Sequence, residues 1–267
     1  MHNMLKITDL KKTFNAGTVN EKKVLNGLSL EVKDGDFITI IGSNGAGKST
    51  ILNAISGTVM PDEGHIVLDG EDITFKSDIQ RAKYIGRVFQ DPMMGTAPQM
   101  WIEENLALAY RRTKKRTLKW GITQKERELY KKSLAQLGLG LEDRLSTKVG
   151  LLSGGQRQAV TLLMATLVKP KILLLDEHTA ALDPKTAATV LELSDRIVKE
   201  NNLTTLMVTH NMQNAIDYGN RLIMMHAGRV IFDVSGEEKK KLTVDMLLKK
   251  FEEISGSEFA NDRALLS

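Results

Sequence analysis

The chain has 267 residues, of which 42% are hydrophobic and 26% charged, and this ordinary composition excludes disorder over most of its length. Its apolar runs, such as Ile172 to Leu175, are far shorter than the roughly 20 residues that a membrane-spanning helix needs. The formal net charge of +4 is too small an excess to choose among anions, lipid headgroups and nucleic acid as partners.

The N-terminal segment reads as two strands. Residues 4–14 and 22–35 carry strand patterns, and the second alternates around Val24, Leu28 and Val32 before a turn at its end. We expect a small antiparallel sheet here. Residues 1–10 lack the apolar stretch of a secretory signal, and the chain has no cysteine, which excludes disulfides and fits a reducing cytoplasm.

A glycine-rich loop follows the next strand. Residues 36–57 pass from an apolar strand through this loop into a helical pattern, as in a parallel α/β core, and that context disfavours a turn that binds nothing. The glycines let N–H groups point at phosphate oxygens, Lys48 adds a cation for the β- and γ-phosphates, and Ser49 supplies a hydroxyl to Mg²⁺. The loop consists of Gly42, Ser43, Asn44, Gly45, Ala46, Gly47, Lys48, Ser49 and Thr50.

Between residues 91 and 150 the strand signals fade and helical spacing takes over. It is clearest in 102–110 and in 125–138, and a capping box of Thr123 and Glu126 introduces the second stretch. The sequence therefore predicts an inserted helical lobe. Its most basic part, Arg111 to Arg116 with Lys119, is either a solvated face or a face toward anionic membrane.

Core strands return at 171–177 and 204–210, separated by a helix that Asp183 and Pro184 open. This alternation predicts a parallel sheet. A hairpin around residues 227–228 closes the pattern, and the charged tail contains an amphipathic stretch near 244–254. We expect a single domain over 1–235, with a helical subdomain at about 91–150 plus the helix that follows Ser153, and a short helical tail over 236–267.

Two carboxylates stand at the end of the apolar strand at 171–177. The carboxyl ends of parallel strands are where open α/β sheets bind ligands. Together with the phosphate loop, the pair Asp176 and Glu177 predicts a nucleoside triphosphatase. Asp176 is expected to face the metal, and Glu177 to orient or deprotonate water.

The segment Leu152–Gln156 reads LSGGQ and lies twenty residues before Asp176. With this pentapeptide the chain resembles ABC ATPases. Ser153 and Gln156 also have capping-box spacing, so they start a helix as well. A serine with Gly154 and Gly155 at a helix start makes an anion site that can accept a γ-phosphate.

The resemblance extends over residues 4–235 and implies an α/β fold of the ABC type. In this P-loop NTPase fold, a parallel core carries an N-terminal antiparallel β subdomain and an inserted helical subdomain. It implies ATP and Mg²⁺ as cofactors. Phe14 resembles the aromatic residue that stacks on adenine, although a core role is equally open, Gln90 resembles the glutamine that links the Mg²⁺ site to the lobe, and His210 resembles the histidine that contacts the γ-phosphate.

The chain departs from the family pattern at one position beside the acids. His178 follows Glu177 where the family commonly has proline. Proline would fix the backbone there, so histidine loosens that constraint and adds a titratable group. The sequence favours a tolerated substitution over a new catalytic role. The next segment, Ala181–Asp183, resembles the one that communicates between two sites, and Asp183 also has the character of an N-cap.

One phosphate loop and one LSGGQ per chain imply, by the family resemblance, that two copies pair head to tail with ATP between Lys48's loop and Ser153's segment. The string at 177–187 resembles bacterial importer subunits that work with a lipoprotein receptor and a branched-chain-amino-acid-like permease. We therefore expect a peripheral subunit on the cytoplasmic face of the membrane, with no nucleic-acid partner, and permease docking at 92–101. A soluble ABC ATPase like the iron–sulfur-assembly ATPase and an export ATPase remain alternatives.

Overall fold

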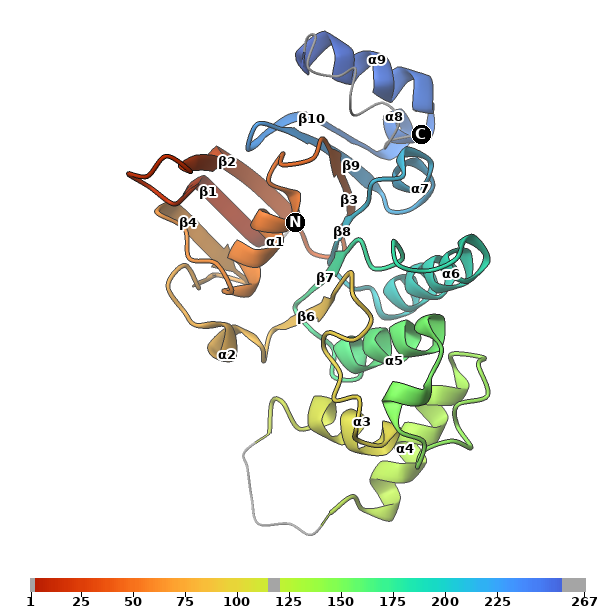
Figure 1. The fold of residues 1–267 in the computed structure, drawn as a ribbon. Coiled ribbons are helices and arrows are strands. Elements are labelled where there is room, and N and C mark those ends of the chain that lie inside the picture. The colour runs from red at the N-terminus through yellow and green to blue at the C-terminus, as the bar shows by residue number, and fades with distance from the viewer. Residues whose placement is uncertain (1–2, 115–120, 256–267) are drawn as a thin grey trace. The chain divides into compact units, whose positions relative to one another are not determined.

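The computed structural model describes residues 3–114 and 121–255, which form two compact units. The first unit contains residues 1–81 and 202–267, and the second contains residues 82–201. Figure 1 shows the elements of both units with their labels. Lys115, Arg116 and Lys119 of the predicted basic stretch lie outside the described residues.

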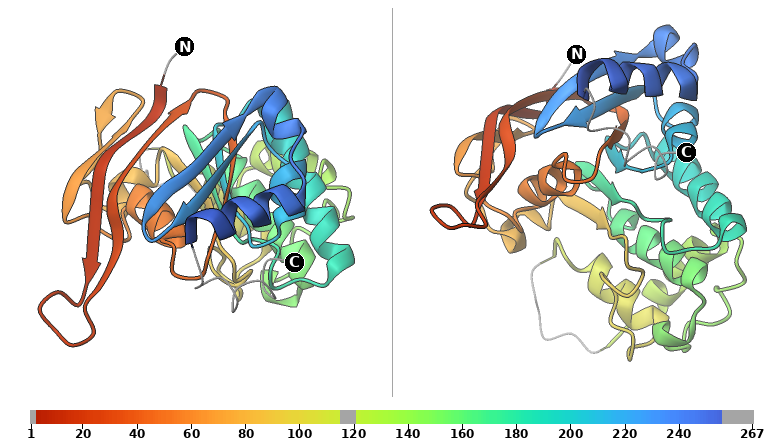
Figure 2. Two further views of the ribbon diagram at one scale, coloured as in Figure 1. Left: turned by 90° about the horizontal axis from the view of Figure 1, so that it is seen from above. Right: turned by 45° about the horizontal axis from the view of Figure 1, so that its top comes forward.

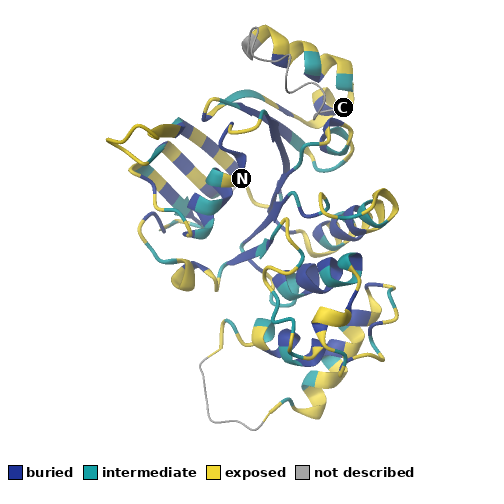
Figure 3. Ribbon diagram, in the orientation of Figure 1, coloured by how far each residue is buried: buried dark blue, intermediate teal, exposed yellow. Residues whose placement is uncertain are grey.

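An antiparallel sheet opens the first unit. Its strands are β1 (Asn3–Phe14), β2 (Lys22–Lys33), β4 (Glu63–Leu68) and β5 (Glu71–Asp72), in the order β2-β1-β4-β5. Buried Leu5 and Ile7 alternate with exposed residues along β1, and Figure 3 shows the resulting bands of buried and exposed positions. This alternation is why the segment forms a sheet with one face on a core.

The same unit contains parallel strands. Strand β3 (Phe37–Gly42) pairs in parallel with β8 (Thr205–Val208) and β9 (Arg221–His226), and β10 (Arg229–Ser235) pairs antiparallel with β9. Every residue of β3 and β8 is buried, which fits sequences that are apolar except for Thr39 and Thr205 and a closing glycine.

Helices complete the first unit. Its helices are α1 (Lys48–Ser56), α2 (Asp78–Arg81), α7 (Met212–Asp217), α8 (Gly236–Lys240) and α9 (Val244–Ser255). Helix α9 lies beside β9 and β10 (Figure 2), and its Leu247 and Phe251 pack in one cluster with Met212 and Met224. Helix α9 is thus attached to the core through Leu247 and Phe251.

The second unit joins two strands to a group of helices. Strand β6 (Ile85–Val88) pairs in parallel with β7 (Ile172–Asp176). The helices are α3 (Ile102–Tyr110), α4 (Gln124–Ala135), α5 (Gly154–Thr166) and α6 (Pro184–Asn201), with a 3₁₀ turn at Val149–Leu151. The predicted capping box forms, since Thr123 Oγ1 accepts from the Glu126 N–H and the Glu126 carboxylate accepts from the Thr123 N–H.

The predicted fold class is confirmed, because parallel core strands, an N-terminal antiparallel sheet and an inserted helical segment are all present. The described basic residues of the lobe contact the protein itself. Arg111 pairs with Glu126 at 2.9 Å, and Arg112 donates to the carbonyls of Ala165 and Val168 at the end of α5. Over 3–114 and 121–255, helices long and apolar enough to cross a membrane are absent.

One buried guanidinium joins helix α1 to the segment that precedes α2. Arg81 has no exposed surface and donates to the carbonyls of Ala54 and Ile55, the last turn of α1, at 2.5 and 2.9 Å. It also donates to Thr74 O and Lys76 O at 2.8 Å each. Burial lowers the pKa of Arg81, so four carbonyl contacts stand in for the water it has lost.

Replacing Arg81 by Met is expected to leave these carbonyls without their donor. Because an unsatisfied buried polar group costs about 1–3 kcal/mol, the free energy of unfolding should fall by roughly 3 kcal/mol. Urea denaturation of the nucleotide-free protein measures the change. The control is Arg229→Met, which removes a single hydrogen bond of an exposed side chain, from Nε to Asn26 O. Equal midpoints for the two variants would contradict this role of Arg81.

Candidate functional site

The predicted phosphate loop connects β3 to α1 in the first unit. Gly42, Gly45 and Gly47 have φ values of 151°, 77° and 98°, in the region that favours glycine. A Cβ at Gly42 would lie 2.1 Å from Met225 O, and one at Gly47 would lie 2.9 Å from Val24 O. Backbone crowding at both positions thus requires glycine, as the sequence pattern predicts.

Lys48 begins helix α1 and turns back over the loop. Its side chain is 5% exposed, and Nζ donates to Gly42 O at 2.7 Å and to Ser43 O at 2.9 Å. The ammonium is therefore held beside the loop's backbone, at the positive end of a helix. A buried cation, a helix start and exposed loop residues together suit a polyanionic ligand such as a triphosphate chain.

The other predicted residues of this unit lie at strand ends. His210 follows β8, whose carboxyl end lies beside that of β3 because the two strands pair in parallel, and it is half-buried. Phe14 is the last residue of β1 and is also half-buried, with the Lys12 ammonium 5.7 Å from its ring centroid. Phe14 is thus only partly covered by the protein.

In the second unit, Asp176 ends β7 beside an arginine of β6. Both side chains are 12% exposed, and Arg87 Nη2 donates to Asp176 Oδ2 at 3.2 Å. Burial lowers the pKa of Arg87, and Asp176 opposes that shift. The Arg87 guanidinium also lies 4.5 Å from the ring centroid of Phe89. Sequence reasoning missed Arg87, whose one signal was a charged residue inside an apolar strand.

The oxygen donors fit Mg²⁺ better than other metals. Within the described ranges, no group of three or more His, Cys, Asp or Glu side chains could hold a metal ion. Mg²⁺ needs no such cage, because it takes one or two carboxylates and completes its shell with phosphate oxygens and water. The Asp176 carboxylate and the Ser49 hydroxyl are hard oxygen donors of this kind.

Glu177 and His178 follow Asp176 in an unusual backbone. Glu177 has a φ of 46°, in the left-handed region. The His178 side chain is 2% exposed and its Nε2 lies 2.9 Å from Ser194 Oγ on α6. Burial lowers the pKa of His178 to about 4, so the titratable group expected from the sequence is neutral near pH 7.

The LSGGQ segment starts α5 as predicted. Ser153 Oγ accepts from the Gln156 N–H at 3.3 Å, and Gln156 Oε1 accepts from the Ser153 N–H at 3.2 Å. A Cβ at Gly155 would lie 2.1 Å from Thr186 Cγ2, and one at Gly154 would lie 3.0 Å from Leu182 Cδ2. A side chain at Gly155 would therefore force Thr186 to move, whereas one at Gly154 would make only a tight contact with the end of a leucine side chain.

Gln90 and Asp183 occupy the places that the sequence predicts. Gln90 is exposed directly after β6 and Phe89, and Gln158 of α5 fixes that segment by donating to Phe89 O at 3.0 Å. Gln158 was not predicted, since its buried amide becomes meaningful only once α5 is placed. Asp183 Oδ1 accepts from the Thr186 N–H at 3.1 Å, so the N-cap forms.

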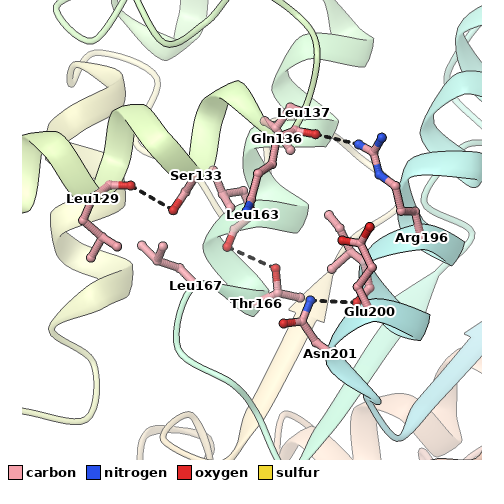
Figure 4. A pocket seen from close by; sticks show the side chains of 11 residues that line it. Leu129, Ser133, Gln136, Leu137, Leu163, Thr166, Leu167, Arg196, Glu200 and Asn201 are labelled. Carbon is pink, nitrogen blue, oxygen red and sulfur yellow. Dashed lines mark hydrogen bonds between the residues drawn. The ribbon is translucent and has the colours of Figure 1, made fainter.

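A separate hollow of about 430 Å³ lies among α4, α5 and α6 (Figure 4). Arg196 crosses its edge and donates to Gln136 O at 2.6 Å. Its lining contains none of the predicted site residues. The predicted residues therefore form two groups, the phosphate loop with Phe14 and His210 in the first unit, and Gln90, the LSGGQ segment, Asp176 and Glu177 in the second.

Comparison with known proteins shows which family the chain belongs to. The profile of the family described as ABC transporter matches residues 25–180. The tyrosine transport ATP-binding protein of Clostridioides difficile is 49% identical over 93% of this chain and 99% of its own length. The xylose/arabinose import ATP-binding protein of Sulfolobus acidocaldarius is 35% identical over 94% of this chain and 96% of its own length.

Solved structures that resemble this chain include ATP-binding cassettes as well. A dimeric ATP-binding cassette in a post-hydrolysis state with ADP and Pi superposes with a TM-score of 0.73 at 30% identity, covering 87% of this chain and 98% of that one. Clostridium perfringens cbiO1, part of an ABC transporter complex, gives 0.75 at 26% identity over 95% and 96%. The chain thus belongs to the ABC transporter family, as an ATP-binding subunit that hydrolyses ATP.

Proposed function

We propose that this subunit energises the import of small solutes such as amino acids. The observation that carries the proposal is the 49% identity, over nearly the whole of both chains, to a protein named for tyrosine transport. Other similar proteins are named for import of methionine and of xylose or arabinose. The export and iron–sulfur-assembly alternatives have no such support among these names.

The proposed chemistry assigns one task to each group of residues. The phosphate loop binds the triphosphate, Lys48 neutralises the β- and γ-phosphates, and Ser49 and Asp176 bind Mg²⁺, which offsets negative charge as phosphate is transferred. Glu177 orients or deprotonates the attacking water. The remaining assignments follow the resemblance: Phe14 stacks on adenine, His210 contacts the γ-phosphate, and Gln90 connects the metal site to the helical lobe.

The proposed partner at the ATP site is a second copy of the chain. Ser153, Gly154, Gly155 and Gln156 of one copy would contact the γ-phosphate held by the loop of the other, so that two equivalent sites form head to tail. The start of α5, where Ser153 is exposed, suits that anion. A dimeric cassette among the similar structures supports the pairing. We propose that residues 1–235 act as one ATPase domain in this dimer, with 236–267 as an appended tail.

The proposed membrane partner is a permease on whose cytoplasmic side the subunit sits, with a substrate-binding lipoprotein reached only through the complex. ABC ATP-binding subunits associate with the membrane peripherally. In the segment after Gln90, Met93, Met94 and Trp101 are 42%, 52% and 43% exposed. Exposed adaptable apolar side chains of this kind suit a docked helix.

Lys48→Ala tests the phosphate loop. Losing the buried cation that faces the phosphates should weaken ATP binding at least ~30-fold, as truncation of one partner of a buried charge pair does. Isothermal titration with Mg-ATP measures the affinity, and the melting temperature reports on folding. Lys199→Ala, which removes an exposed lysine paired with Asp195 at 2.6 Å, should bind normally. A folded Lys48→Ala protein with unchanged affinity would show that the loop is not the nucleotide site.

Glu177→Gln tests the hydrolytic role. The amide keeps the shape but loses the basic carboxylate, so turnover should drop on the order of 10²–10⁴-fold while ATP still binds. Size-exclusion chromatography should then show a dimer with Mg-ATP and a monomer with ADP. Adding Ser153→Arg should abolish the dimer, because a bulky cation would occupy the proposed γ-phosphate site. Wild-type hydrolysis by Glu177→Gln would remove this residue from catalysis.

Met93→Asp and Met94→Asp test the docking segment. A carboxylate placed in an apolar contact costs desolvation, so co-purification with the permease of the same transporter should drop at least ~10-fold. Val19→Asp, at a fully exposed residue of the first unit, is the control and should co-purify normally. If all three variants retain the permease equally, docking occurs elsewhere.

A further inference from the structure

The backbone of Glu177 is in a conformation that glutamate rarely adopts. Its φ of 46° places Cβ close to the following carbonyl, and such a residue persists only when its surroundings hold it. A local turn contributes, since the Ala180 N–H donates to Glu177 O at 2.9 Å. A second anchor holds the same turn.

That anchor is the next residue. His178 is buried, and its Nε2 lies 2.9 Å from the hydroxyl of Ser194, which is itself 1% exposed. The Ser194 hydroxyl donates its hydrogen to Val190 O at 2.7 Å. Since a serine carries one hydroxyl hydrogen, the imidazole must be the donor in the other bond. His178 therefore donates to Ser194 through its Nε2–H.

The loop from β7 to α6 is consequently attached to α6 at two points. At the far end Asp183 caps the first turn of the helix through the Thr186 N–H. At the near end His178 reaches Ser194, which lies beyond the second turn of the same helix. A change of Glu177 to a right-handed conformation would swing the backbone of His178 and break its hydrogen bond. The left-handed conformation of Glu177 and the hydrogen bond from His178 to Ser194 therefore depend on each other.

We infer that His178 is a positioning residue for hydrolysis, whose hydrogen bond to Ser194 holds Glu177 in the left-handed conformation from which its carboxylate meets the attacking water. This inference rests on the proposed role of Glu177. Where the family commonly has a proline ring to restrict the backbone, this chain uses a buried hydrogen bond to a neighbouring helix.

The test compares two serines that make the same local bond. Ser133 of α4 donates to Leu129 O at 2.9 Å (Figure 4), one turn back along its helix, as Ser194 does on α6, but only Ser194 contacts His178. We would purify the full chain as wild type and as the variants Ser194→Ala, Ser133→Ala, His178→Phe and His178→Gln. ATP turnover at saturating Mg-ATP and ATP affinity are measured for each protein at a temperature well below the lowest melting temperature of the set. The melting temperature of each protein is measured separately.

Ser194→Ala and His178→Phe should each lower kcat about tenfold, equivalent to about 1.4 kcal/mol in the barrier, with ATP affinity changed less than twofold. The two changes combined should cost no more than His178→Phe alone, because they remove one bond. His178→Gln, which keeps an N–H donor, should recover part of the rate. Ser133→Ala should match wild type in both quantities.

Two results would overturn the inference. One is a kcat for Ser194→Ala equal to that of Ser133→Ala. The other is a parallel fall of kcat, ATP affinity and melting temperature, which would make the bond a general structural one. Glu177→Gln in the same assay separates this from the proposed function. If Glu177→Gln loses turnover while Ser194→Ala keeps it, only the positioning role fails, whereas normal turnover by Glu177→Gln removes the role of Glu177 and this inference with it.

Discussion

Both parts of the site depend on one constraint. At three glycines, neighbouring atoms lie too close to the backbone to leave room for a side chain. In the first unit, a Cβ at Gly42 would lie 2.1 Å from a neighbouring carbonyl oxygen, and a Cβ at Gly47 would lie 2.9 Å from another. In the second, Gly155 leaves 2.1 Å to Thr186. Gly47 and Gly155 lie at the starts of α1 and α5, and Gly42 ends β3. Close packing therefore shapes the backbone in both parts of the site.

Burial then sorts the charged and neutral side chains around these backbones. Lys48 is nearly covered and lies over loop carbonyls, which keeps a positive charge next to the backbone of the glycine-rich loop. Arg87 fixes one oxygen of Asp176, as hydrogen-bonded neighbours commonly orient carboxylates that bind metals. His178 is the opposite case, because burial without a charged partner keeps it neutral. Lys48 and the pair of Arg87 with Asp176 are thus held as fixed charges, whereas His178 is held as a neutral side chain.

Much of the fold, and many of the residues of the candidate site, could be predicted because the relevant sequence patterns are local. The phosphate loop, the Thr123 and Ser153 capping boxes and the helix over 102–110 all depend on spacings of a few residues. The pairing of Arg87 with Asp176 could not be predicted, since it requires the register of β6 against β7. The contact of His178 with Ser194 likewise spans sixteen residues and a loop whose path the sequence does not encode locally. In the sequence, Arg112 is part of a charge run that is typical of a solvated surface. Its carbonyl acceptors could not be predicted, because they depend on where the end of α5 lies.

Arg81 gives helix α1 a mechanical property. The helix starts at Lys48, which holds the loop, and its last turn is bonded through Arg81 to Thr74 and Lys76. Nine residues of α-helix form a stiff rod about 13 Å long. A rod fixed at both ends has little freedom to tilt or slide relative to the loop at its start and to residues 74–76 near its end.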